Sequence, residues 1–282
     1  MKKKNLIYVV SLCAALSSCS TVALTGRKQL MLVSDEEVMS LSNQSYTQYM
    51  SSAKVSTDKA NTAMVERVGR RIANAVETYL NANGHSADVK NYSWEFHLVQ
   101  DSQANAFCMP GGKIVVYEGL LPITKTESAL AIVLGHEVAH AVAKHSAERM
   151  SQQLIANYGS QALGAILSGT GTATQNLAQT VYGLGANYGV MLPYSRKDES
   201  EADQMGLIFA AMAGYDPSVA VDFWKRMAQV GSQTPEFMSD HPSDARRIAA
   251  IQKNLPMALK YYKPAATTTK TSVKSTKSTK RR

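Results

Sequence analysis

The sequence contains little cysteine and few aromatic residues. Its longest apolar run is at the N-terminus and is too short to span a bilayer. Of 282 residues, three are cysteine and 7% are aromatic. A disulfide framework needs more cysteines than this, so the fold must depend on an apolar core and on any bound metal. No stretch beyond the N-terminus is apolar for long enough to span a bilayer. An apolar fraction of 45% and a charged fraction of 18% are ordinary for a globular protein and exclude a largely disordered one.

Positive charge is concentrated at the two ends of the chain. The formal net charge is +8. Three lysines at positions 2 to 4 and six basic residues among the last nineteen supply nine positive charges, which leaves −1 for the rest. Since no basic stripe is visible on the folded part, the sequence predicts no nucleic-acid partner. The tail, residues 264–282, is mostly Thr, Ser and Lys and is predicted to be disordered.

The N-terminus has the organisation of an export signal. Three lysines precede an apolar run at residues 6–16, and the sequence Leu-Ser-Ser-Cys, which ends at Cys19, resembles a bacterial lipobox. We therefore expect a signal peptide at residues 1–18 and a lipidated leader at 19–33. The alternative is an ordinary signal peptide with an incidental cysteine. Ser20 resembles an outer-membrane sorting signal, which predicts a lipid-anchored protein of the bacterial cell envelope facing the periplasm.

Cysteine counting leaves one free thiol. Cys13 is lost with the signal peptide and Cys19 carries lipid, so only Cys108 remains and no intramolecular disulfide can form. Because no partner base is identified for Cys108, we expect it to be a small buried apolar residue rather than a nucleophile.

Hydrophobic periodicity and capping signals predict a mostly helical domain over residues 34–263. Helices are predicted at about residues 35–50, 58–80, 127–153, 195–213, 218–230 and 243–254, and strands at 92–99 and 113–117. The two strands are expected to be neighbours in one small sheet. Ser34 and Thr124 each lie three residues before a glutamate, which is the spacing of a capping box. The small-residue stretch 156–194 is interpreted as helices or as a mobile cover.

The motif H-E-x-x-H, at His136-Glu137-Val138-Ala139-His140, lies inside the helix predicted at 127–153. Residues four apart on an α-helix differ by about 40° in azimuth, so both imidazoles point at one spot. Two histidines at this spacing are typical zinc ligands, and Glu137 is placed to act as a general base. The motif fixes only three residues and also arises by chance, so its neighbours must decide between the two interpretations.

A catalytic zinc ion needs a third protein ligand and one open position. Residues 195–203 hold four carboxylates, and the simpler interpretation of this segment is a solvated helix start. Among the four, only Glu199 is followed one helical turn later by another acidic residue, Asp203. The competing Glu201 has Met205 there. We therefore predict Glu199 as the third ligand and Asp203 as the acceptor that fixes the tautomer of a ligating imidazole.

Three further polar residues are candidates for roles near the metal. His241 precedes Pro242, where it can donate to an oxyanion, act as a fourth ligand or simply mark a helix entry. Arg247 is a candidate for binding the oxyanion or the substrate carbonyl. His145 lies nine residues after His136, about 180° round an unbroken helix, so we expect a hydrogen-bonded structural histidine rather than a ligand.

These residues resemble the motifs of the HtpX and CAAX-prenyl-protease type of gluzincin metallopeptidases. The resemblance rests on the H-E-x-x-H motif, Glu199-Ser200-Glu201-Ala202-Asp203, His241-Pro242, Arg247-Ile248, Asn105-Ala106-Phe107, Pro110-Gly111-Gly112-Lys113-Ile114 and Glu118-Gly119-Leu120-Leu121. It covers about residues 30–255. It points to a soluble bacterial lipoprotein branch similar to the core of the mitochondrial overlapping-activity peptidase.

The resemblance implies an α+β architecture, a mostly helical zincin (gluzincin) fold with a small β-sheet packed on the metal-binding helix, and one Zn²⁺ per chain. It also implies that residues 113–117 form or adjoin the edge strand that pairs with an extended substrate. The implied substrate-binding residues are Asn105, Gly111, Gly112, Ile114, Val115 and Val116. In such relatives the segment after the metal helix, here 156–194, can plug the cleft, and the His of His-Pro, here His241, can contact zinc in a latent state.

Together these features predict a zinc-dependent endopeptidase of the cell envelope. Its protein or peptide substrates are expected to be misfolded or misassembled envelope proteins, and its N-terminal lipid is expected to attach it to the membrane. The competing interpretation is a chaperone-like or scaffold lipoprotein whose zinc site is structural or latent. The two differ in whether the metal keeps an open coordination position and whether unfolded proteins are cleaved.

Overall fold

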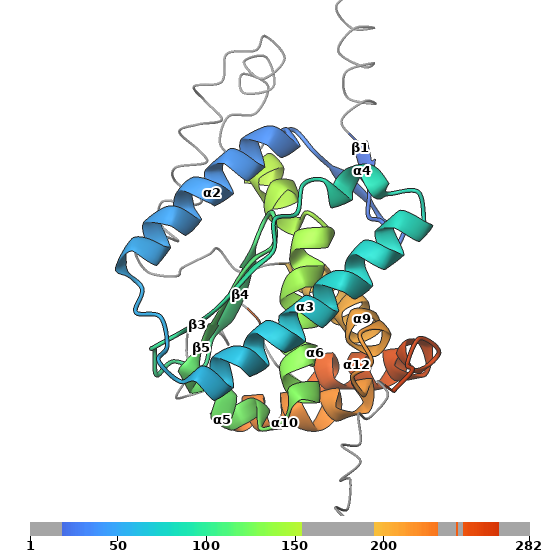
Figure 1. Cartoon of the computed structure of the whole chain (residues 1–282). Coiled ribbons are helices and arrows are strands. Elements are labelled where there is room, and N and C mark those ends of the chain that lie inside the picture. Colours follow the sequence, from blue (N-terminus) through green and yellow to red (C-terminus); the bar gives the residue numbers. More distant parts are fainter. Residues whose placement is uncertain (1–18, 154–194, 231–240, 242–244, 265–282) are drawn as a thin grey trace, which may run out of the picture.

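One buried helix, α6 (Glu127–Val142), organises the fold and carries the H-E-x-x-H motif. It is buried along almost its whole length from Ala129 onward, as a helix that is apolar on all sides must be. Helices α3 (Lys59–Ala82) and α9 (Arg196–Met212) and strand β4 (Ala106–Met109) pack around it (Figure 1). The computed structural model describes residues 19–153, 195–230, 241 and 245–264.

The remaining helices lie before and after this centre. They are α2 (Asp35–Ser52), α4 (Ser86–Val89), the 3₁₀ turn η1 (Glu118–Leu120), α5 (Leu121–Thr124), the 3₁₀ turn η2 (Pro217–Val219), α10 (Ala220–Val230) and α12 (Ala245–Leu259). Of the two predicted capping boxes, the one at α2 is present and is formed by Ser34 and Glu37. Ser195, the first residue of the helix predicted at 195–213, caps α9. Helix α12 continues to Leu259 rather than ending at Asn254.

A three-stranded sheet packs against α6. Strand β5 (Lys113–Tyr117) is central, with β3 (Glu95–Val99) parallel on one side and β4 antiparallel on the other. The two predicted strands do pair, whereas β4 was not predicted, because its sequence Ala-Phe-Cys-Met does not alternate polar and apolar residues. Cys108 on β4 is buried in the main core, as expected.

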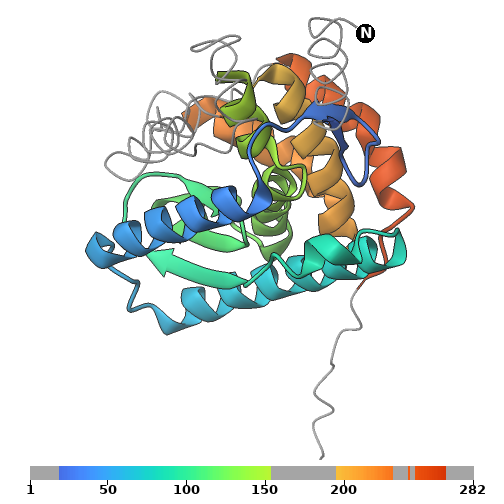
Figure 2. The same cartoon turned by 90° about the horizontal axis from the view of Figure 1, so that it is seen from above.

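The sheet lies between α2 and the pair α3 and α6. One face of the sheet contributes to the main core with α3 and α6, and the other face packs on α2 around Tyr46. Figure 2 shows α2, the sheet and α3 on one side of α6, and the C-terminal helices on the other. This arrangement is the predicted α+β zincin architecture, a mostly helical fold with a small sheet on the motif-bearing helix.

The start of α6 differs from the prediction. Its N-cap is Thr126, whose hydroxyl accepts a hydrogen bond from Ala129 N at 3.1 Å. Thr124 instead ends α5, and Lys125 between them is in the left-handed conformation, with φ 63°. Capping-box spacing alone therefore chose the wrong threonine, because a separate short helix precedes α6.

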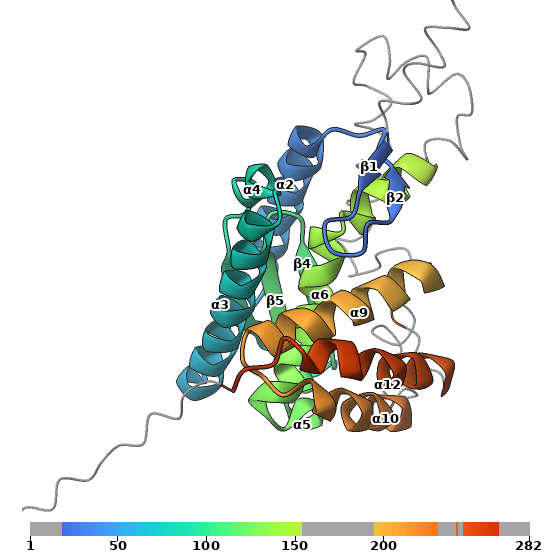
Figure 3. The ribbon, with the colours of Figure 1, turned by 90° about the vertical axis from the view of Figure 1, so that its right-hand side faces the viewer.

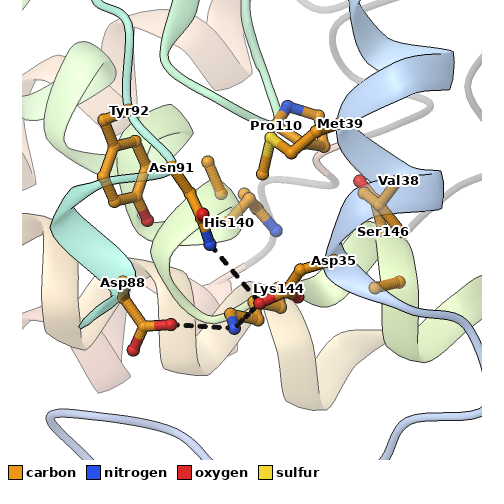
Figure 4. Close-up of a pocket in the computed structure, with 12 residues that line it drawn as sticks. Asp35, Val38, Met39, Asp88, Asn91, Tyr92, Pro110, His140, Lys144 and Ser146 are labelled. Carbon is orange, nitrogen blue, oxygen red and sulfur yellow. Dashed lines mark hydrogen bonds and ion pairs between the residues drawn. The ribbon is translucent and has the colours of Figure 1, made fainter.

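The end of α6 also differs from the prediction. The helix ends at Val142, and a second helical stretch, residues 145–153, follows a break at Lys144, which has φ 56°. Figure 4 shows the Lys144 amine between Asp35 and Asp88. The two carboxylates accept hydrogen bonds from this amine at 2.7 and 3.0 Å. All three residues line a small pocket between α2, α4 and α6. These distant carboxylates stabilise the turn, so helical periodicity could not reveal it.

The segment predicted as a leader forms a small hairpin. Strands β1 (Cys19–Thr21) and β2 (Lys28–Leu30) pair antiparallel, and Val22 between them is buried in the main core. Figure 3 shows this hairpin beside the helical stretch 145–153. The N-terminal segment is therefore packed on the domain.

Three predictions fall outside the described residues: the signal peptide at 1–18, the cover at 156–194, and the tail from residue 265. Among the helices that the structure describes, none is both long and apolar enough to cross a membrane.

Candidate metal centre

Four buried side chains converge from three parts of the chain. His136 and His140 come from α6, Glu199 comes from α9, and His241 precedes α12. One potential ligand atom of each lies within 4.8 Å of the other three, and no residue of the four is more than 5% exposed. Imidazole nitrogens and carboxylate oxygens are common ligands of zinc and related metals. The cluster could therefore hold a metal ion.

The spacing of the donor atoms fits a tetrahedral ion. His136 Nε2 lies 3.1 Å from His140 Nε2 and 3.1 Å from His241 Nδ1. The Glu199 carboxylate lies 3.0 to 3.5 Å from the three imidazoles. Ligands about 2.0–2.1 Å from a tetrahedral zinc ion are about 3.3–3.4 Å from one another. The donor set and its dimensions are thus those that a zinc site requires.

Two glycines set the separation of α6 and α9. A Cβ added to Gly135 would lie 2.6 Å from the Gly206 carbonyl oxygen, and one added to Gly206 would lie 2.6 Å from His136 N. Both obstacles are backbone atoms, so only glycine fits at this crossing. Motif reasoning missed these two residues, although a glycine within a helical pattern is a signal of close packing.

Asp203 and Arg247 support the cluster from α9 and α12. Asp203 Oδ1 lies 3.0 Å from His136 Nδ1, where a carboxylate can accept the N–H of a ligating imidazole and leave Nε2 for the metal. Arg247 donates to both Asp203 oxygens at 2.8 Å and to the His241 carbonyl at 3.0 Å, and its guanidinium stacks 3.6 Å from the centroid of Trp224.

These contacts bear on the role of Arg247. Each of its three nitrogens has an acceptor within the described residues. The geometry therefore gives Arg247 a positioning role toward Asp203 and His241. Its oxyanion-binding role stays a prediction, because none of these contacts tests it.

A second chain of contacts reaches His140 from the opposite side. His145 Nδ1 lies 2.9 Å from His140 Nδ1, and its Nε2 lies 3.0 Å from Glu201 Oε2. Burial alone raises the pKa of Glu201, but hydrogen bonds, led by that from His145, lower it to about 2. The break after α6 turns His145 back towards His140, which the unbroken helix assumed from the sequence would not allow.

Glu137 is a buried carboxylate beside the cluster. It is 4% exposed, and its Oε1 has no hydrogen-bond partner within the described residues, His241 Nε2 being 3.6 Å away. Burial raises the pKa of Glu137 despite the opposing influence of nearby histidines. A carboxyl with a raised pKa and an unsatisfied oxygen suits a group that takes up and releases a proton.

The electrostatics of three other groups favour metal binding, whereas His136 must first lose a proton. Burial alone lowers the pKa of His136, but hydrogen bonds with Asp203 and Glu199 raise it to about 9. Burial alone raises the pKa of both Glu199 and Asp203. The net pKa of Glu199 is nevertheless below its ordinary value, chiefly because of His241, and that of Asp203 is lowered chiefly by Arg247. Burial lowers the pKa of His140 well below its usual range, which favours the neutral imidazole. Carboxylates and neutral imidazoles are the protonation states that bind metals.

The strand predicted to meet the substrate is the central one. Strand β5 pairs on both sides, and Ile114, Val115 and Val116 are fully buried. Its main-chain groups are therefore engaged within the sheet, and β5 adjoins an edge strand instead of forming one. The edge next to α6 is β4, which pairs with one strand only among the described residues.

The other predicted substrate residues lie at the two ends of β4. Asn105 is buried, and its side-chain oxygen accepts a hydrogen bond from the following main-chain N–H at 2.8 Å. Gly111 and Gly112, with φ 87° and 84°, form the turn into β5. Their carbonyl oxygens accept from Ser93 N and Glu95 N at 2.9 and 3.0 Å. These three residues fix the ends of the edge strand.

An α+β fold in which an H-E-x-x-H helix and a glutamate from a second helix enclose a candidate metal site is the arrangement of the zincin class of metallopeptidases. The family is given by comparison with known proteins. The model of peptidase family M48 matches residues 60–255, and the chain therefore belongs to peptidase family M48.

Relatives occur in mitochondria and in bacteria. The chain is 39% identical over 173 residues to the mitochondrial metalloendopeptidase OMA1 of Schizosaccharomyces pombe, a match that covers 60% of this chain and 49% of that protein. It is 31% identical over 248 residues to the mitochondrial metalloendopeptidase OMA1 of Homo sapiens, covering 84% and 46%. It is 30% identical over 238 residues to the beta-barrel assembly-enhancing protease of Yersinia pestis, covering 80% and 46%. The chain spans about half the length of these relatives.

Proposed function

We propose that this member of peptidase family M48 is a zinc-dependent endopeptidase, with His136, His140 and Glu199 as metal ligands and Glu137 as general base. The observation that carries the proposal is a compact cluster of donor atoms beside a buried carboxylate oxygen that lacks a partner within the described residues. Three protein ligands leave one coordination position for chemistry. When bound, zinc supplies Lewis-acid chemistry, which polarises the scissile carbonyl and makes water nucleophilic at neutral pH.

The side chains of the protein carry out the proton transfers and hold the site in place. Glu137 takes a proton from the attacking water and then delivers it to the leaving amine. Its raised pKa favours this exchange, because the carboxyl can hold the proton between the two steps. Asp203 fixes the tautomer of His136, and Arg247 holds Asp203 in place.

The proposed substrates are proteins or peptides bound in extended form along β4. This strand packs against α6, and an extended peptide can add to a strand edge through main-chain hydrogen bonds, whatever its sequence. Asn105 at one end of β4, and Gly111 with Gly112 at the other, then define where the bound segment enters and leaves.

We further propose that Cys19 carries lipid and attaches the enzyme to a bacterial envelope, at the outer membrane and facing the periplasm. The N-terminal sequence pattern supports this location, as does the resemblance to the lipoprotein branch of the HtpX and CAAX-prenyl-protease type. One relative is named for enhancing beta-barrel assembly, which favours misfolded or misassembled envelope proteins as substrates. The mitochondrial relatives support the chemistry but not this location.

Glu137→Gln tests the mechanism. The variant should still bind one zinc ion per chain, and its cleavage of an unfolded protein should fall by about 10²-fold or more. Full retained activity would contradict the assignment of the general base. The anchor is tested separately, since Cys19→Ala should move the protein out of the membrane fraction; a variant that stays there would rule out lipid at Cys19.

One observation favours a second candidate, a chaperone-like or scaffold lipoprotein with a structural or latent zinc site. His241 Nδ1 lies 3.1 Å from His136 Nε2 and 3.0 Å from Glu199 Oε1, so it can complete a four-residue site and close the open position. His241→Ala distinguishes the possibilities. Increased cleavage indicates latency, decreased cleavage indicates a catalytic histidine, and zinc binding without cleavage in either protein favours the scaffold.

A further inference from the structure

A chain of buried side chains connects His140 to the N-terminal hairpin. His145, which is fully buried, lies with Nδ1 2.9 Å from His140 Nδ1 and with Nε2 3.0 Å from Glu201 Oε2. Glu201 in turn accepts hydrogen bonds from Arg27 Nε at 2.6 Å and from Thr25 Oγ1. The chain runs from α6 through the second helical stretch and α9 to the loop between β1 and β2.

The direction of these hydrogen bonds determines which nitrogen of His140 faces the cluster. An ionised Glu201 only accepts, so His145 Nε2 must carry the hydrogen. A neutral His145 then presents Nδ1 as an acceptor, and His140 Nδ1 must be the donor. The hydrogen of His140 is thus held on Nδ1, and the Nε2 lone pair points to His136 and Glu199, where a metal would bind.

Arg27 completes the outer end of this chain. It donates through Nη1 and Nη2 to the two oxygens of Glu148 at 2.9 and 2.7 Å, and through Nε to Glu201. One guanidinium therefore compensates two carboxylates that are each less than 10% exposed. A buried carboxylate without such a partner is strongly disfavoured. The hairpin supplies the cation that lets Glu201 stay ionised beneath His145.

We propose that His145, Glu201 and Arg27 are positioning residues of the metal centre, which fix the tautomer and ring orientation of His140 and make the hairpin of residues 19–30 part of its support. The inference rests on the proposed function, since it takes His140 to bind zinc through Nε2. It assigns the hairpin a role in metal affinity, beyond any role as a tether.

Two amide substitutions of His145 distinguish a positioning role from a packing role. Both replace the imidazole by a neutral polar group, but they place that group at different ends of the ring position. In His145→Asn the amide lies near the position of Nδ1 and can accept from His140, whereas in His145→Gln it reaches towards Glu201. We expect zinc affinity of the full chain, measured by competition with a chromophoric chelator, to fall about 10-fold or more in His145→Gln, which leaves His140 Nδ1 without its acceptor. The fall should be smaller in His145→Asn, which keeps that acceptor and loses only the contact with Glu201. Thermal unfolding of the metal-free chains checks that both fold.

Arg27→Gln tests the outer end of the chain and decides the matter if His145→Gln does not fold. Its matched control is Arg67→Gln, which breaks the exposed ion pair with Glu127. Arg27→Gln should weaken zinc binding, whereas Arg67→Gln should leave it unchanged. Equal affinities for the two His145 variants, or for Arg27→Gln and its control, would overturn the proposal. A wild-type chain that binds no zinc would instead overturn the proposed function.

Discussion

Gly135 on α6 and Gly206 on α9 meet backbone to backbone, and a side chain at either position would collide with the main chain of the opposite helix. These two helices carry three of the four candidate ligands. The crossing therefore determines how closely Glu199 can approach the two histidines of the motif.

Gly206→Ala should separate the two helices. The added methyl group meets main-chain atoms of Gly135 and His136, so we expect a loss of about 1–3 kcal/mol in the free energy of unfolding and weaker zinc binding. Urea unfolding and zinc titration measure the two effects. Ser200→Ala, on the exposed face of α9, is the matched control. A Gly206→Ala chain as stable as this control would show that the crossing tolerates a side chain.

Asp203→Asn should weaken both the fold and the metal site. The substitution leaves the buried Arg247 guanidinium facing an amide, which should lower the free energy of unfolding by about 3 kcal/mol. It also removes the carboxylate beside His136 Nδ1, which should lower zinc affinity about 10-fold. The control is Asp222→Asn, because Asp222 is 77% exposed and pairs only with Lys225 at 3.8 Å among the contacts described. If both variants unfold at the same urea concentration, the buried pair contributes nothing.

Removal of the metal should lower the melting temperature. A ligand present at about 100 times its Kd stabilises the folded state by about 2.7 kcal/mol, and chelation withdraws that contribution. Thermal scans with EDTA, and then with zinc restored, measure the reversible shift. Glu199→Gln should show little response to either addition. An identical melting temperature in EDTA and in excess zinc would argue against a metal site in the wild-type chain.

Glu95 should make stability depend on pH in the acidic range. Its carboxylate accepts from Lys113 Nζ at 2.6 Å and from Tyr46 at 2.9 Å, and the hydrogen bond from Lys113 lowers the pKa of Glu95. A carboxyl whose pKa is lower in the folded chain stabilises it above the unfolded pKa, about 4.3, and loses that effect as pH falls through the folded value.

The comparison of wild type with Glu95→Gln measures this effect. Their melting temperatures should differ at pH 7 and converge as pH falls below about 4. The difference should be small, since the side chain is 43% exposed and solvent screens the pair. Glu66→Gln, which removes an exposed pair with Arg70, controls for the loss of one surface carboxylate. A difference that stays constant from pH 7 to pH 3 would disprove the link to Glu95.

Features that depend on spacing within one helix could be predicted from the sequence. The four-residue interval of His136 and His140 puts both rings on one face of α6, and the same interval relates Glu199 to Asp203 on α9. Ser195 marks the start of α9 because a hydroxyl there can satisfy a free main-chain N–H. Such signals are local, so no knowledge of the tertiary structure was needed.

Features that depend on distant segments could not be predicted. The break at Lys144 is held by Asp35, which is 109 residues away in the chain, and by Asp88, which is 56 residues away. The contact of Arg27 with Glu201 joins residues 174 apart. Each of these interactions is visible only after the fold has brought the partners together, because neither residue type nor spacing identifies the partner.

The bond between Arg247 and Asp203 also has a consequence in time. A chain that emerges N-terminus first presents His136 111 residues before Arg247, the residue that holds its supporting carboxylate. The support of Asp203 by Arg247 is therefore complete only after α12 has folded onto α9. Growing chains, and fragments cut before α12, contain the H-E-x-x-H motif and Glu199 but lack the residue that holds the carboxylate beside His136.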